Sequence, residues 1–501
     1  MKKYFYLLLA IVISTALVAC QGGSDNNEKE ERDSIVVGIQ QDLDSLDPFL
    51  ATAAGTREVM FNIFEGLVKP DENGNLIPAV AGSYDVSEDG SVYTFKLREG
   101  VKFHNGDVVT AEDVKYSIEY NAGLIEESEL IVSAFSLISS VNIVDPSTVE
   151  VVLSEPDTEF IGFMTVAIVP MNYDKQTEAP VATGPFKFVS YSTGDSLVME
   201  RFDDYWGEKP ELKTVTFKIV TSSATAVMEL QAGSIDIYPY MTMDEVDQLG
   251  DDINVIYGNT NLVQGLFINN SFEPFQNEKV RQALCYAINR QEIIDMVAGG
   301  HGTIIGSILY PCFGKYNNAQ TENMYLYNVE TAKELLKEAG YEDGFTFTVK
   351  VPSSYQFHMD TALVIKEQLK AIGVTMEIEG IEWATWLEDV YKGKQYEATI
   401  IGFDSNMAPK DMARRYVSGN SKNMIFFEND EYDELYARAV ATTDDNEKIE
   451  CYKRMQEIVA EHAGSVFIQD PAKIVAVSKD IEGFAFYPVY VLDMSKISFV
   501  K

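Results

Sequence analysis

The spacing of apolar residues changes near Asn277, and this change limits the chain to a fold with at least two differently built parts. Before Asn277, apolar and polar residues alternate in short segments, which predicts strands at 34–40, 91–97, 141–153, 186–189, 196–201 and 214–220. After it, helical spacing predicts helices at 278–298, 329–339, 359–371, 431–440 and 447–462, separated by strands at 346–351, 375–379 and 399–403. Because single hydrophobic cores stop growing near ~250–300 residues, a chain of 501 residues also needs more than one core. The sequence therefore predicts an α+β part joined to an α/β part.

The first twenty residues have the layout of a signal peptide. Lys2 and Lys3 precede an apolar run at 4–18, which is shorter than the ~20 residues of a membrane span. The run ends in Leu17-Val18-Ala19-Cys20, which resembles the bacterial lipobox, where the cysteine receives a diacylglycerol and becomes the mature N-terminus. We expect lipidation at Cys20 and an extracytoplasmic protein on the outer face of the cell membrane or facing the periplasm; a single membrane-spanning anchor is the alternative.

Residues 21–34 are expected to be a flexible tether, because residues 21–33 contain no apolar side chain and are rich in charge. The chain as a whole carries 39 Lys and Arg against 78 Asp and Glu, a formal net charge of -39. Such a surface repels phosphate backbones, so we expect no nucleic-acid partner. Four cysteines are too few for a disulfide scaffold at this length, and Cys285 and Cys451 lie in helical apolar patterns typical of buried thiols.

Common catalytic signatures are missing from the sequence. The four histidines have no metal-binding helical spacing, and neither a Gly-x-Ser-x-Gly motif nor a Walker A motif occurs. The segment 71–75 resembles a calcium loop only superficially, and a tight turn is expected there. We therefore expect no enzyme activity, no cofactor and no metal site.

Several short motifs follow one another in a fixed order. They are DSLDP (44–48), FEGL (64–67), YTFKLREGVKFHNG (93–106), TAEDV (110–114), TGPF (183–186), GSID (233–236), VRQAL (280–284) and AKELL to AGY (332–341). Each motif alone is weak. Together, from about residue 35 to the C-terminus, they resemble the extracytoplasmic solute-binding proteins of family 5, the dipeptide-, oligopeptide- and nickel-binding group of ABC importers.

The resemblance implies an α/β fold: a two-lobed clamp like the type II periplasmic binding proteins, with an additional α+β domain inserted in lobe I. Two chain crossings, expected near Thr183–Pro185 and Ile268–Ser271, would let the lobes close on a solute like a hinge. The expected ranges are lobe I at 35–65, 183–270 and 465–501, the inserted domain at 66–182, and lobe II at 271–464. His104 and Arg281, which lie in the shared motifs, are expected to have structural roles.

The implied function is capture of a peptide and its delivery to the permease and ATPase subunits of an ABC importer, by a monomeric receptor. Two alternatives remain open. The solute could be a nickel chelate, an oligosaccharide or a cationic compound, or the protein could be a surface receptor that reads a peptide signal without importing it.

The resemblance also implies positions for ligand contacts. The family's peptide binders hold the ligand's α-amino group on an Asp in a Gly-Trp-x-x-Asp-Tyr segment, which corresponds here to 402–407. Asn406 takes the place of that Asp, and Asp404 is the only acid nearby, so either residue could take the role. The other matched positions are Trp383, Phe403, Thr52, Ala54, His358 and Phe467. Dipeptide binders carry an arginine for the ligand carboxylate near 353–358, and this stretch has none, which favours a longer peptide bound through its main chain.

Overall fold

The computed structural model describes residues 32–501 except 127 and 406, and residues 34–501 form one compact unit. The predicted lipidation site Cys20, most of the predicted tether and Asn406 lie outside the described residues. Within the part that the structure describes, no helix is long and apolar enough to cross a membrane.

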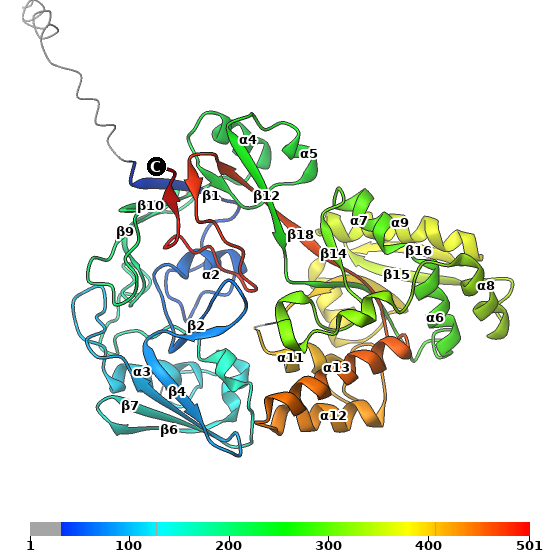
Figure 1. Cartoon of the computed structure of the whole chain (residues 1–501), viewed down its shortest axis with the longest axis horizontal. Helices are drawn as coiled ribbons and strands as arrows, with labels where there is room; N and C mark the ends of the chain where they lie inside the picture. Colours follow the sequence, from blue (N-terminus) through cyan, green and yellow to red (C-terminus); the bar gives the residue numbers. More distant parts are fainter. Residues whose placement is uncertain (1–31, 127, 406) are drawn as a thin grey trace, which may run out of the picture. The chain divides into compact units, whose positions relative to one another are not determined.

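The long strand β18 (Val466–Ser478) organises the main sheet, because its two ends pair with different sets of strands (Figure 1). Its first half pairs with β13 (Val263–Ile268) and β14 (Gly302–Ile304). Its second half pairs with β11 (Ile237–Tyr238) and β12 (Ile253–Asn259). The sheet continues on one side through β1 (Ser34–Ile39), β10 (Thr214–Ile219), β9 (Ser196–Arg201) and β8 (Phe186–Ser192), and on the other through β17 (Ala398–Phe403), β15 (Thr346–Pro352) and β16 (Thr375–Ile381).

We call the part around β1 and β10 lobe I and the part around β15, β16 and β17 lobe II. The chain passes between them at residues 260–262, where Asn261 has a left-handed φ of 63°, and again inside β18. The expected crossings at Thr183–Pro185 and Ile268–Ser271 were therefore wrong. All six residues of β13 and the first six of β18 are buried, and a fully buried strand has the same sequence character in either lobe, so the sequence could not locate the crossing.

Thr183-Gly184-Pro185 instead packs against the segment that follows helix α2 (Ala54–Met60). The Gly184 N–H donates to Ile63 O at 2.9 Å, and a Cβ on Gly184 would lie 2.5 Å from the same oxygen. His104 Nδ1 accepts from Ala182 N–H, so its Nε2 carries the proton and donates to Gly184 O at 3.0 Å. Burial lowers the pKa of His104 to about 4, which keeps the ring neutral. The structural role expected for His104 is confirmed.

A separate core lies between residues 67 and 168. It fills the space between a sheet in the order β4 (Ala81–Val86), β5 (Val92–Leu97), β7 (Thr148–Leu153), β6 (Ile138–Asp145) and the helix α3 (Ala111–Asn121). Thr110 and Asp113 form a capping box at the start of α3. We call this part the inserted region; nearby are the short strands β2 (Val68–Pro70) and β3 (Leu76–Pro78).

Lobe II carries the predicted helices, with one difference. The expected helix at 278–298 is two helices, α6 (Glu278–Ala287) and α7 (Arg290–Val297), because Ile288 is extended and the Asn289 side chain caps α7 by accepting from Glu292 N–H. The prediction of one continuous helix was wrong. The other helices are α8 (Val329–Glu338), α9 (Gln356–Leu369), α11 (Pro409–Ala413), α12 (Asp430–Ala441) and α13 (Asp445–Glu461).

Arg281 and two thiols are buried in lobe II, as expected for structural residues. The Arg281 guanidinium donates to the carbonyl oxygens of Phe275, His462 and Ala463 at 2.7–3.1 Å, so it ties loops together through backbone groups. Cys285 and Cys451 are free and buried. Burial raises the pKa of Cys285 to about 12, so this thiol is unreactive at neutral pH.

The inserted region also touches lobe II directly, at the end of helix α12 and along α13 (Figure 1). Thr158 N–H and its hydroxyl both contact Val440 O at 3.2 Å, and Lys448 Nζ donates to the Thr158 hydroxyl at 2.6 Å. We call this interface the ionic contact. It consists of Asp157, Thr158 and Glu159 from the inserted region and Lys410, Lys448 and Tyr452 from lobe II.

The charged groups of the ionic contact are almost fully removed from water. Lys410 Nζ pairs with Asp157 Oδ2, and the Lys410 backbone N–H donates to Glu159 Oε2 at 3.0 Å. The Tyr452 hydroxyl donates to the other Glu159 oxygen. Burial raises the pKa of Glu159 and lowers that of Lys448, while their mutual attraction opposes both shifts. Each buried charge therefore depends on its partners.

Candidate functional site

A cavity of about 440 Å³ lies between lobe I, the inserted region and the first residues after β17. Its wall is mostly apolar: the side chains include Phe49, Met60, Phe61, Phe64, Phe163 and Val166, with Val489, Tyr490 and Val491 from the C-terminal segment. Lobe II contributes Met407. Three charged side chains also line the cavity, namely Arg57, Glu65 and Lys69. A concave apolar wall with a few charged groups is typical of a small-molecule site.

The turn before α2 sets the position of the lobe I wall. The Asp44 carboxylate accepts from Thr52 N–H at 2.8 Å, from Ala53 N–H at 2.9 Å and from the Thr52 hydroxyl at 2.8 Å. Although burial opposes it, these bonds and one from Thr56 hold the pKa of Asp44 well below its usual value. Asp44 thereby holds the turn that leads into α2 and places Thr52 and Ala54 next to the cavity-lining Ala51 and Arg57.

Two of the three charged lining groups neutralise each other. Glu65 is buried, and its carboxylate accepts from Lys69 Nζ at 2.8 Å, from the Tyr205 hydroxyl at 2.7 Å and from Trp206 Nε1 at 2.7 Å. The Lys69 ammonium also lies over the Trp206 ring. The charges of Glu65 and Lys69 are therefore balanced within the protein and are not available to a ligand.

Arg57 is different, because it is exposed and forms no ion pair with any described residue. Its Nη2 donates to Thr52 O at 2.8 Å, which fixes the direction of the guanidinium beside the cavity. The other guanidinium N–H groups stay available for a ligand.

The predicted aromatic residues Trp383 and Phe403 lie on a surface of lobe II that we call the lobe II wall. Trp383 is 37% exposed and stacks on the buried Trp386, with ring centres 5.2 Å apart and planes at 4°, while Tyr355 meets it edge-on at 5.3 Å. Phe403, at the end of β17, is covered by the guanidinium of Arg415 at 4.1 Å. The structure therefore presents a fixed aromatic surface with one exposed face.

Asp404 joins this wall to the cavity. Its Oδ2 accepts from the hydroxyl of Tyr490 at 2.6 Å, and Tyr490 is a cavity-lining residue of the C-terminal segment. We call this bond the cleft contact. Burial and the neighbouring Asp404 raise the pKa of Tyr490, so the hydroxyl stays protonated and donates.

His358 and Phe467 are buried beside the crossing strands. His358 Nδ1 lies 2.9 Å from Gln264 Nε2, and the Gln264 oxygen accepts from Gln469 Nε2 at 2.9 Å. Burial lowers the pKa of His358 to about 4, so its Nδ1 is a neutral acceptor. Phe467 pairs with Gly265 in the sheet and packs near Tyr416.

Of the eight ligand positions suggested by the sequence, the structure describes seven, and none of these seven lines the cavity itself. Thr52, Ala54 and Asp404 adjoin it, and Trp383 and Phe403 lie on the lobe II wall. Asn406 lies outside the described residues. Sequence reasoning missed Arg57 and Tyr490. Neither residue belongs to a motif or a matched ligand position of the sequence analysis, so no sequence signal singled them out.

Asp470, in the crossing strand β18, is an uncompensated acid. It is fully buried, its Oδ1 accepts from Leu262 N–H at 3.1 Å, and its Oδ2 has no hydrogen-bond partner in the described part of the chain. Burial raises the pKa of Asp470 to about 7. As for metals, residues 32–501 apart from 127 and 406 contain no group of three or more His, Cys, Asp or Glu side chains placed to hold an ion.

Comparison with known proteins finds relatives over most of the chain. The sequence model described as bacterial extracellular solute-binding proteins, family 5 Middle, matches residues 75–424. The glutathione-binding protein GsiB of Pectobacterium atrosepticum is 29% identical over 479 residues, which cover 90% of this chain and 91% of GsiB.

Two solved structures extend the comparison to three dimensions. HbpA2 from Haemophilus parasuis has a TM-score of 0.85 at 25% identity and covers 93% of this chain and 100% of its own. The periplasmic binding protein DppA from Helicobacter pylori, in complex with the peptide STSA, has a TM-score of 0.74 at 27% identity and covers 93% of this chain and 99% of its own. The peptide complex is thus the less similar of the two in three dimensions, although its sequence identity is slightly higher.

Proposed function

This chain belongs to the bacterial extracellular solute-binding proteins of family 5 and has the two-lobed fold of the type II periplasmic binding proteins. On that premise, we propose that it captures a peptide between its lobes and delivers it to the permease of an ABC importer. Proteins of this class bind a solute outside the cytoplasm and are not enzymes.

The observation that carries the proposal is the cavity beside the lobe II wall. Its apolar lining includes one cation, Arg57, and the lining residue Tyr490 donates to the carboxylate of Asp404, which lies just outside the lining. A peptide in its ionised form carries both charges and apolar side chains, so it complements this arrangement. GsiB, named for glutathione, and DppA, solved with STSA, are similar proteins whose ligands are peptides.

We propose that Trp383, Phe403 and Asp404 contact the peptide when the lobes close, with Thr52 and Ala54 at the rim and His358 and Phe467 behind them. Closure excludes water, so an aromatic wall adds contact area without requiring one peptide sequence. Asp404 would pair with the peptide's ammonium, whereas Asn406 could supply only neutral hydrogen bonds.

The test begins with the purified, denatured protein and identification of any released small molecule by mass spectrometry. Calorimetry with that molecule then compares Asp404→Asn with Asn406→Ala. We expect Asp404→Asn to weaken binding more, because loss of one member of an enclosed charge pair costs about 2–5 kcal/mol. A released solute that is not a peptide would refute the proposed ligand class. Stronger weakening by Asn406→Ala would assign the main anchor to Asn406.

We also propose that the protein is anchored through a lipid on Cys20 and acts as a monomer. The lipobox-like sequence at 17–20 supports the anchor, since acyl chains on one residue hold a protein on a membrane at ~0.8 kcal/mol per buried CH₂. Growth with a radioactive fatty acid should label the wild type and not Cys20→Ser. Equal label on both proteins would contradict the anchor.

A further inference from the structure

Arg57 is the one charged lining group of the described cavity whose charge is not already balanced. Lys69 and Glu65 pair with each other, whereas Arg57 contacts only the carbonyl oxygen of Thr52. The neighbouring lining residues Met60, Phe61 and Phe64 offer no counter-charge, and the one acid on α2, Glu58, is buried and pairs with Lys473. An arginine held in a fixed direction beside an apolar cavity is a ready partner for an anion.

We propose that Arg57 is the carboxylate anchor of the binding cavity, and that the ligands are solutes with a carboxylate next to an apolar group. The inference rests on the proposed function and deepens it, because it names the chemical class and the orientation of the ligand. The carboxylate lies on lobe I at Arg57, the apolar group fills the space between Phe61, Phe64 and Phe163, and any ammonium points towards Asp404 on lobe II.

The geometry supports a directional contact. Arg57 Nη2 donates to Thr52 O, and Thr52 is itself held by hydrogen bonds to Asp44. These bonds fix the position and direction of the guanidinium beside the cavity. A planar guanidinium can donate two parallel hydrogen bonds to a carboxylate, which an amide cannot accept in the same way.

The net charge of the protein makes this anchor decisive. With a formal charge of -39, the surface as a whole repels anions. Salt screens that repulsion beyond about 10 Å. A single cation inside the cavity can therefore attract an anion there although the surface as a whole repels it. A ligand carboxylate therefore binds only where it contacts Arg57.

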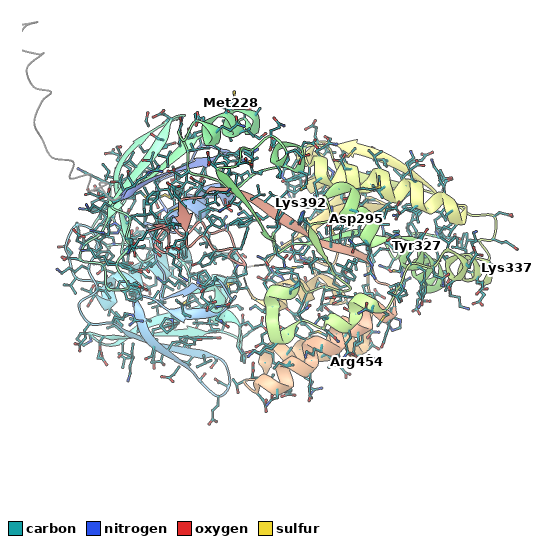
Figure 2. The ribbon with its side chains drawn as sticks, turned by 45° about the horizontal axis from the view of Figure 1, so that its top comes forward. Met228, Asp295, Tyr327, Lys337, Lys392 and Arg454 are labelled. Atoms are coloured by element: carbon teal, nitrogen blue, oxygen red, sulfur yellow. The ribbon has the colours of Figure 1, made fainter. Side chains whose placement is uncertain are left out.

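The experiment uses matched acid and amide probes on the full folded chain. The probes are the tripeptide Ala-Ala-Phe with a free or an amidated C-terminus, and phenylbutyrate with its amide. Calorimetry is run on the wild type, Arg57→Gln, Arg57→Lys and the control Arg454→Gln. Arg454 is an arginine on α13 that pairs with Glu431, Glu457 and Glu461 and lies away from the cavity lining (Figure 2). Circular dichroism confirms that each variant is folded.

We expect the wild type and Arg454→Gln to bind the acids at least about tenfold more tightly than the amides. Arg57→Gln should remove this preference, and Arg57→Lys should keep part of it, because an ammonium retains the charge but not the two-pronged geometry. Equal binding of acids and amides by the wild type, an acid preference that survives in Arg57→Gln, or no binding of either acid would overturn the inference.

The two probe pairs separate this inference from the proposed function. If the tripeptides do not bind but phenylbutyrate binds through Arg57, the carboxylate anchor stands and the peptide proposal fails. If both tripeptides bind equally well, the peptide proposal stands and the carboxylate anchor is refuted.

Discussion

The ionic contact and the cleft contact are two of the places where lobe II touches the rest of the chain, and they are built in opposite ways. The ionic contact buries Asp157, Glu159, Lys410 and Lys448, each less than 10% exposed. The cleft contact is a single hydrogen bond from Tyr490, which is 44% exposed, to Asp404. Buried charges need their partners, whereas one exposed hydrogen bond exchanges readily with water or a ligand. We therefore expect the ionic contact to persist when the lobes move and the cleft contact to break and re-form.

This difference suggests where the lobes pivot. The crossing strands β13 and β18 and the ionic contact are fixed connections, and the cavity lies beside the weak one. A ligand that binds in the cavity has to displace only the hydrogen bond of the cleft contact. The free-energy cost of closing the lobes around it is therefore small. Domain closure of this kind uses a few residues at the connections and leaves each lobe intact.

The largest effect is expected from breaking the ionic contact. Lys410→Met leaves the Asp157 carboxylate buried without its cation, which should lower the free energy of unfolding by about 3–5 kcal/mol. Urea unfolding measures this. The double variant Asp157→Asn with Lys410→Met should recover most of the loss, because no unpaired charge remains. A loss below about 1 kcal/mol for Lys410→Met would mean that the ionic contact is not a fixed connection.

A large, pH-dependent effect is expected at Asp470, which is buried like the ionic contact but lacks a counter-charge. Because its folded pKa is raised to about 7 from 3.8, the wild type gains full stability from this group below about pH 4 and loses it as the pH rises through 7. Asp470→Asn should therefore be more stable than the wild type by on the order of 4 kcal/mol at about pH 8, and equal to it at about pH 4.

Urea unfolding at both pH values checks this, with the exposed Asp251→Asn as the control. A stability difference between Asp470→Asn and the wild type that does not change with pH would show that the Asp470 carboxylate is not protonated in the folded state.

A smaller effect, on binding and not on stability, is expected from the lobe II wall. Trp383→Ala should weaken ligand binding by about tenfold, because a closing cleft would bury its exposed face at about 25 cal/mol per Å². Tyr327→Ala, which removes a comparably exposed aromatic residue away from both the cavity and the lobe II wall, should leave binding unchanged (Figure 2). Calorimetry with the identified ligand compares them. Equal affinities for Trp383→Ala and the wild type would remove Trp383 from the site.

The smallest effect is expected at the cleft contact itself. Tyr490→Phe removes the hydrogen bond to Asp404 and should lower the free energy of unfolding by less than about 1 kcal/mol. Binding of the ligand should not weaken, because Asp404 becomes free to accept from the ligand. A loss of stability as large as that of Lys410→Met would erase the contrast between the two contacts.

Much of the fold was predictable from the sequence, because it rests on local signals. The capping box at Thr110 and Asp113 and the cap at Asn328 mark helix starts within three residues of chain. The ordered motifs then identified the family and its α/β clamp, which are confirmed. The domain boundaries stay a prediction.

The candidate site was less predictable, because it depends on contacts between distant segments. The bond between Tyr490 and Asp404 joins residues 86 positions apart, and the Asp157–Lys410 pair joins residues 253 apart. No local pattern encodes such pairings. The resemblance supplied positions on the lobe II wall, but the unpaired charge of Arg57 became visible only when its neighbours were known.

The central claim is that a solute closes the lobes around the cavity, and the radius of gyration tests it most directly. Small-angle X-ray scattering would be recorded on the protein stripped of solute and again after saturation with the molecule identified by mass spectrometry. We predict a smaller radius with the ligand, for the wild type and for Tyr490→Phe alike. A radius that does not change when calorimetry shows full occupancy would contradict the claim that the two lobes form a clamp.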